Sequence, residues 1–151
     1  MLDDLYSAKI LKAAANMPRA GRLTAPDGSA EKVAKLCGSR IRVEVALDAN
    51  GRIADFAQEV KACALGQAAA AVLGENAIGA SLDEIEMARV ALRDMLTNGG
   101  APPTGRFSDL AMLAPVKDYP PRHASTQLAF EAAAEACRAV LTARTRPAGV
   151  A

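Results

Sequence analysis

Three side chains in this sequence could together ligate a metal ion: Cys37, Cys63 and the single histidine, His123. Two thiolates and one imidazole would give zinc or iron three ligands and leave a fourth position open. Cys63 stands at the predicted start of a helix, where free N–H groups and the helix dipole favour the thiolate. The competing interpretation is that a free cysteine acts as a small buried hydrophobic residue. We retain only that interpretation for Cys137. It lies about 18 Å beyond Ser125 along the last predicted helix, too far to join a site at the start of that helix.

A predicted β-hairpin is the element that would bring the two thiols together. Apolar and polar residues alternate over 41–47, which indicates a half-buried strand, and 52–61 forms the returning strand. The turn DANG (48–51) places Asn and Gly where a positive φ is needed. With a three-residue loop, Asp48 lies opposite Arg52, and position 37 then falls opposite position 63. A β-bulge would shift this pairing by one residue.

His123 lies in the segment PPRHAST (120–126), which opens the last predicted helix. Two prolines suit the entry to a helix. If they hold the chain extended through Arg122, the imidazole falls in the first turn and can swing toward the cysteines. The competing interpretation is a surface or capping histidine.

The remaining elements indicate an α+β fold with a small three-stranded antiparallel sheet and helices packed on one of its faces. Helical patterns cover residues 3–16, 63–76, 82–96 and 122–144, with a short helix near 108–113. Ser81 and Glu84 form a predicted capping box. Residues 22–36 are irregular, with a turn at 25–28 and a short strand on each side. Strands that are few and consecutive argue against a parallel βαβ layout. We expect one domain over residues 1–143 and a flexible tail over 144–151.

Composition excludes several classes of partner. The 18 basic and 17 acidic residues are intermixed and give a net charge of +1, which does not favour nucleic acid or a membrane surface. No segment approaches the roughly 20 apolar residues needed to span a bilayer, and the acidic N-terminus is unlike a signal peptide. Three cysteines, an odd number, do not form a disulfide framework. We therefore expect a protein of the reducing cytoplasm.

Taken together, these segments resemble the NifU/IscU/SufU-like iron–sulfur cluster assembly scaffolds over about residues 5 to 140. The start, LYSAKILKAAANMPRAG (5–21), is similar to the N-terminal helix and Asn-Pro-Arg segment of the family. The stretch from Cys37 to Ala70 is similar to the family core, in which Cys-Gly precedes a hairpin and a second cysteine opens a helix. RHASTQLAF (122–130) is similar to the region of the third family cysteine.

The family site consists of three cysteines and an aspartate two residues after the first cysteine, and this chain departs from it twice. Cys37 and Cys63 match the pattern, but Ser39 occupies the aspartate position and Ser125 that of the third cysteine. A neutral hydroxyl is a poor ligand for zinc or iron beside a thiolate. His123 lies two residues before Ser125, about 200° away on a regular helix, so it reaches the site only if residues 122–124 are not helical.

Three hypotheses follow from the resemblance, and none of them makes the protein an enzyme. The one we prefer is an atypical scaffold or carrier that holds an iron–sulfur cluster or zinc with Cys37, Cys63 and His123. A homodimer or a partner's ligand is compatible with this hypothesis. The resemblance implies a cysteine desulfurase and recipient apo-proteins as partners. The second hypothesis is a SufU-like, zinc-dependent sulfur acceptor. The third is a degenerate scaffold fold that binds no metal and acts as an interaction module or accessory subunit.

Overall fold

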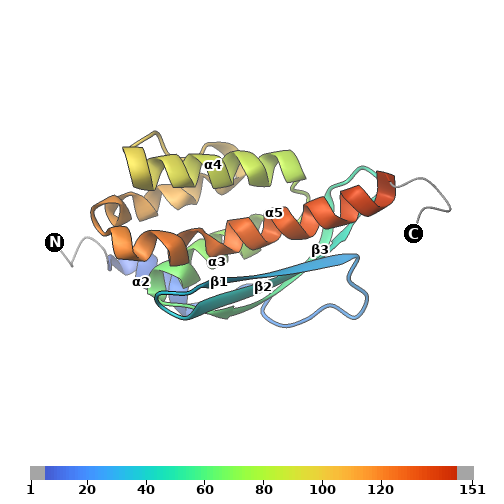
Figure 1. Cartoon of the computed structure of the whole chain (residues 1–151), viewed down its shortest axis with the longest axis horizontal. Coiled ribbons are helices and arrows are strands. Elements are labelled where there is room, and N and C mark those ends of the chain that lie inside the picture. Colours follow the sequence, from blue (N-terminus) through green and yellow to red (C-terminus); the bar gives the residue numbers. More distant parts are fainter. Residues whose placement is uncertain (1–5, 146–151) are drawn as a thin grey trace.

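The computed structural model describes residues 6–145 and shows helices stacked on one face of a single sheet (Figure 1). The chain order is α2 (Ala8–Ala15), β1 (Gly28–Ala34), β2 (Ser39–Leu47), β3 (Ile53–Lys61), α3 (Ala64–Asn76), α4 (Leu82–Asn98), the 3₁₀ segments η1 (Gly105–Asp118) and η2 (Pro120–Arg122), and α5 (His123–Thr145). The sheet is antiparallel in the order β1-β2-β3. The predicted α+β class and three-stranded sheet are confirmed.

The alternating pattern of β2 forms the inner face of the sheet. The side chains of Ile41, Val43 and Val45 are fully buried, and α5 packs across β1 and β2 on this face, with α4 beyond it (Figure 1). The alanine-rich α3 is buried over most of its length between α2, α5 and η1. Small side chains let these helices approach closely, so the core needs few aromatic residues.

The hairpin between β2 and β3 has the predicted turn but a shifted register. Asp48 and Arg52 are paired through a backbone hydrogen bond of 2.8 Å, and Gly51 has φ +80°. Leu47 pairs with Ile53 while Ala46 pairs with Asp55, so one extra residue of β3 forms a bulge. Beyond the bulge every pair is displaced by one position, and the predicted pairing of 37 with 63 is therefore wrong by one residue.

Other boundaries differ from the predictions where burial overrides local pattern. Only one strand, β1, forms around the turn at 25–28. The segment expected as a short helix and a proline-rich bend is instead 3₁₀ helix through Asp118, because Leu113 and Val116 are both buried. α5 continues to Thr145, two residues past the predicted domain end, and residues 146–151 of the predicted tail lie outside the described residues. The single-domain boundary stays a prediction.

None of the helices that the structure describes over residues 6–145 is long and apolar enough to cross a membrane.

Candidate functional site

Cys37 lies in the turn of residues 35–38 that joins β1 to β2. Gly38 has φ +74°, a conformation that glycine adopts at no steric cost, and its N–H donates to the carbonyl of Ala34 at 2.9 Å. This turn leaves Cys37 exposed to solvent. Its Sγ lies 3.1 Å from the Oγ of Ser39, the buried first residue of β2.

Cys63 is the N-cap residue of α3 and reaches the same place from the other end of the hairpin. Its backbone is extended, with φ −66° and ψ 170°, and its side chain makes no capping hydrogen bond. The Sγ is instead 3.4 Å from the Oγ of Ser125, which is buried in the first turn of α5. The thiol is thus held between the starts of α3 and α5.

Gly66 permits this close approach of the two helices and was missed by the sequence analysis. A Cβ on Gly66 would lie 3.0 Å from the carbonyl oxygen of Ser125 and 2.9 Å from the Cβ of Ala62. Both distances are shorter than ordinary contacts, so only glycine fits here without a shift. A glycine inside an otherwise alanine-rich helix was the signal that could have identified it.

The hydroxyl groups around Cys37 favour its thiolate. The Ser39 hydroxyl has the largest effect, the Ser39 backbone N–H adds to it, and Ser125 contributes as well; together they lower the pKa of the Cys37 thiol despite some desolvation. Ser125 therefore lies beside both thiols, which brings Cys37 and Cys63 to the same end of the hairpin. Cys137 differs, since burial raises the pKa of its thiol to about 11.

His123 does not join the two cysteines. It is the first residue of α5 and has helical φ and ψ, and residues 120–122 before it form 3₁₀ helix rather than the predicted extended chain. Its ring Nε2 lies 2.9 Å from the carbonyl oxygen of Val116 and 3.1 Å from that of Lys117. Because the chain is helical from Pro120 onward, His123 and Ser125 lie on opposite faces, and Ser125 faces the thiols.

The donors that do converge are two thiols and two hydroxyls. Among residues 6–145, no group of three or more His, Cys, Asp and Glu side chains is placed to hold a metal ion. The predicted three-ligand set of Cys37, Cys63 and His123 is therefore not present in this arrangement. Every charged residue within three positions of the four converging donors is basic: Lys35, Arg40, Arg42, Lys61 and Arg122.

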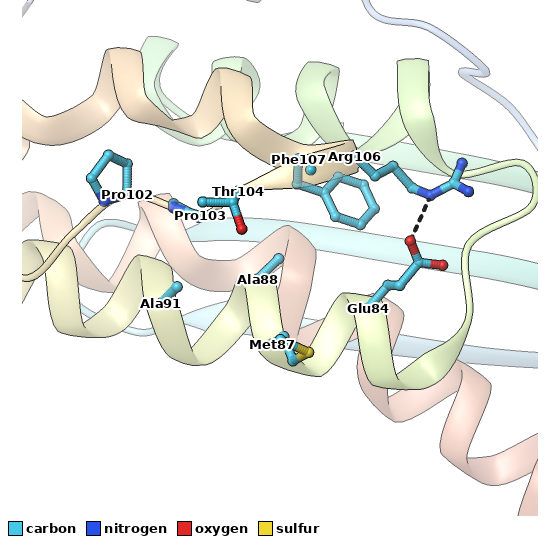
Figure 2. A pocket seen from close by; sticks show the side chains of 10 residues that line it. Glu84, Met87, Ala88, Ala91, Pro102, Pro103, Thr104, Arg106 and Phe107 are labelled. Atoms are coloured by element: carbon cyan, nitrogen blue, oxygen red, sulfur yellow. Dashed lines mark hydrogen bonds and ion pairs between the residues drawn. The ribbon is translucent and has the colours of Figure 1, made fainter.

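A hollow lies away from the cysteines, between α4 and residues 102–107 (Figure 2). It has a volume of about 230 Å³ and is lined largely by apolar groups, including Met87 and Phe107. Its polar end is the ion pair of Glu84 with Arg106, 3.1 Å apart, and Arg106 also donates to the carbonyl of Ile78. These charges hold the loop before α4 and are already paired, so the thiol site remains the stronger candidate.

Comparison with known proteins shows what the chain as a whole is similar to. The chain matches the family model described as NifU-like N terminal domain over residues 5–126. It is 47% identical to the N-terminal region of a nitrogen-fixing NifU-like protein from Brucella abortus, with 93% of this chain and 97% of that chain covered and a TM-score of 0.91. No curated protein matches the chain.

A more distant structure supports the fold alone. It is a protein from Fervidobacterium islandicum AW-1 described as an iron–sulfur cluster assembly scaffold for the SUF system. That chain is 21% identical, with 89% of this chain and 98% of that one covered, and its TM-score is 0.80.

Proposed function

Because the chain belongs to the family of NifU-like N-terminal domains, we propose that it is a scaffold or carrier in iron–sulfur cluster assembly that holds its cargo at Cys37 and Cys63. The observation that carries this proposal is the convergence of these thiols beside Ser39 and Ser125. Residues distant in sequence thus meet at the positions where the family pattern has its ligands.

The cargo determines which partners this role requires. A cysteine desulfurase would supply sulfur, and apo-proteins would receive the cluster. The protein itself would bind and release cargo without catalysing a reaction. A reducing compartment such as the cytoplasm would keep both thiols free for this purpose.

The donors of one chain suit a metal ion or cluster only in part. Thiolates are the usual ligands of iron–sulfur clusters, which take four of them. Cys37 and Cys63 provide two, while Ser39 and Ser125 provide neutral hydroxyls that bind zinc or iron weakly. The remaining ligands must come from outside these four side chains.

Anaerobic reconstitution with ferrous iron and sulfide tests the proposal. We expect the wild-type chain to retain iron and acid-labile sulfide after desalting, and Cys37→Ser and Cys63→Ser each to lose most of both. Cys137→Ser is the matched control, because its thiol is buried away from the site, and it should load like wild type. Wild-type protein that retains no iron, sulfide or zinc would instead support the metal-free interaction module.

A sulfur acceptor is the second candidate, favoured by the exposure of Cys37 and its lowered pKa. The Cys37 thiolate would attack the outer sulfur of a desulfurase persulfide, the desulfurase thiolate would leave, and Cys37 would carry the persulfide. Transfer of labelled sulfur to wild type but not to Cys37→Ser would support this candidate. Accelerated turnover of a cysteine desulfurase would distinguish the acceptor from a passive carrier.

A further inference from the structure

A groove bounded by α2, the end of α3 and η1 lies apart from the thiol site. Its volume is about 560 Å³, and small-molecule sites in proteins typically measure about 300–1,000 Å³. α3 packs against both α2 and η1, and these two segments also contact each other. Val72 in this groove lies roughly 14 Å along α3 from Cys63 at the start of that helix. We call it the α2–η1 groove.

The charges that line the α2–η1 groove differ in sign from one element to the next. Lys9 and Lys12 belong to α2, and both are exposed. Glu75 of α3 and Asp109 of η1 line the same groove and are exposed as well. The groove therefore presents ammonium groups from one element and carboxylates from the two others.

These opposite charges do not pair with one another. None of the four forms an ion pair with any residue over 6–145. Elsewhere on the surface such pairs do form, as between Lys32 and Glu135, whose charged atoms are 3.1 Å apart. The groove thus holds its ammonium and carboxylate groups apart, and a molecule that carries both charges could contact both.

The surface between the charged groups is apolar. It consists of Ala13 on α2, Ala71 and Val72 on α3, and Met112 on η1. Ala71 and Val72 are buried, and Met112 is partly buried against the core, so packing fixes these side chains whether or not a ligand is present. An apolar lining with a few polar groups that orient the ligand is typical of small-molecule sites.

We infer that the α2–η1 groove binds a zwitterion with an apolar body, an amino acid or a short peptide with free termini. The carboxylate of the ligand pairs with Lys9 and Lys12. Its ammonium group pairs with Glu75 and Asp109, and its apolar side chain packs on Met112. A ligand with a single charge would leave one of the two charged sides without a partner. The inference does not depend on the proposed scaffold function.

NMR of protein labelled with ¹³C in its methionine methyl groups tests the inference at Met112. The chain has five methionines, and Met112→Leu identifies the signal. We expect alanyl-leucine or L-leucine to shift the Met112 signal saturably and to leave that of Met87, 73% exposed on α4, unchanged. Added salt should weaken the binding, because the ion pairs are exposed. Comparison of the two ligands distinguishes a peptide site from an amino-acid site.

Ligands that lack one charge test the role of each side. N-acetyl-alanyl-leucine lacks the ammonium group, and alanyl-leucine amide lacks the carboxylate. Each should bind about threefold to tenfold more weakly than alanyl-leucine, as expected for the loss of one or two exposed ion pairs. In Lys9→Gln/Lys12→Gln the difference between alanyl-leucine and its amide should disappear, because the groups that recognise the carboxylate are gone.

The reciprocal variant is Glu75→Gln/Asp109→Asn, in which the difference between alanyl-leucine and its N-acetyl form should disappear. The matched control is Asp83→Asn/Arg93→Gln, which removes two exposed charges of opposite sign from α4. It should bind alanyl-leucine with wild-type affinity.

Three outcomes would overturn the inference. They are the absence of a saturable shift at Met112 with either ligand, equal binding of the free and the capped peptides, and persistence of the preference for free termini in both groove variants. Reconstitution with iron and sulfide tests the scaffold proposal separately, so either conclusion can fail while the other stands.

Discussion

At the scale of single residues, the chemistry of each cysteine is set by what surrounds its sulfur. Cys37 is exposed on a turn and has hydroxyl neighbours, whereas Cys137 is 1% exposed among apolar side chains. Hydrogen bonds to the thiolate lower the pKa of the first thiol, and desolvation raises that of the second. Identical side chains thus differ in reactivity.

We predict that iodoacetamide alkylates Cys37 at neutral pH while native Cys137 remains unmodified, as measured by peptide mass spectrometry. In Ser39→Ala the hydroxyl that lowers the pKa of Cys37 is gone. The thiolate fraction at neutral pH should fall and alkylation of Cys37 should slow. Ser29→Ala, an exposed serine on β1, is the control and should leave the rate unchanged. An unaltered pH–rate profile in Ser39→Ala would contradict the assignment.

Restoring the family ligands should strengthen metal binding. Ser39→Asp together with Ser125→Cys would replace two weak neutral donors with a carboxylate and a thiolate beside Cys37 and Cys63. We predict that zinc affinity rises by more than about tenfold in competition with a chromogenic chelator. If affinity does not change, the pocket no longer has the geometry of a ligand site.

His123 provides a direct test of the ligand set predicted from the sequence. Its ring nitrogen lies within hydrogen-bond distance of two carbonyl oxygens at the end of η1. We predict that His123→Ala lowers the free energy of unfolding by about 0.5–1.5 kcal/mol and leaves the metal content of reconstituted protein unchanged. Urea denaturation and metal analysis measure the two effects. Loss of most of the metal with unchanged stability would restore histidine as a ligand.

At the scale of elements, the site depends on how closely α3 approaches the start of α5. Gly66 creates that approach, and Gly28 creates a similar one between β1 and the later part of α5, at the opposite end of the sheet. A Cβ on Gly28 would lie 2.9 Å from the carbonyl oxygen of Ala136. The two glycines therefore form a matched pair, one beside the thiols and one remote from them.

We predict that Gly66→Ala and Gly28→Ala each lower the free energy of unfolding by about 1–3 kcal/mol through overpacking. Only Gly66→Ala should also reduce metal retention, because it moves Ser125 and Cys63 apart. Denaturation and iron content, measured for both variants in parallel, check this. Equal iron retention in the two variants would show that this helix contact does not control the site.

At the scale of the whole molecule, one buried carboxylate ties the irregular N-terminal segment to the sheet. Glu44 on β2 is 4% exposed and accepts a hydrogen bond of 2.8 Å from the N–H of Leu23. That bond is the main reason why its pKa lies below the usual range, with Arg42 assisting against desolvation. A carboxyl with a lowered pKa stabilises the fold at pH values above the unfolded-state pKa, and this stabilisation is lost as the pH falls.

We therefore predict that stability decreases as the pH falls below about 4.3, the ordinary glutamate value, and that Glu44→Gln flattens this decrease. The variant should also lose about 1–2 kcal/mol at neutral pH, because a hydrogen bond to a charged acceptor is weakened. Thermal unfolding across the pH range measures both effects. Glu31→Gln, an exposed glutamate on β1, should change neither. If the stability of Glu44→Gln decreases with falling pH as steeply as that of wild type, the pH dependence belongs to other carboxyl groups.

Much of the fold could be predicted from local patterns. The alternation in 41–47, the glycine at position 51 and the capping box of Ser81 with Glu84 all rest on interactions within a few residues, and all three are present. The convergence of Cys37 with Cys63 follows from the same hairpin. A bulge was considered from the sequence, but its presence on β3, opposite Ala46 and Leu47, could not be predicted, because nothing in the residues themselves marks where a strand gains one extra position.

The sequence by itself determined that Cys37 and Cys63 lie at the same end of one hairpin, because a hairpin fixes its own ends through regular hydrogen bonding. The position of Ser125 beside them was implied by the family resemblance, and packing of α5 against α3 places it there. Only the tertiary structure decided that His123 stays apart from them. The path from α4 to α5 is set by burial of Leu113 and Val116 against the helices, which no local pattern encodes. That burial winds residues 105–122 into 3₁₀ turns and starts α5 at His123. The serine then faces the sulfur atoms, and the imidazole remains at the carbonyl oxygens of η1.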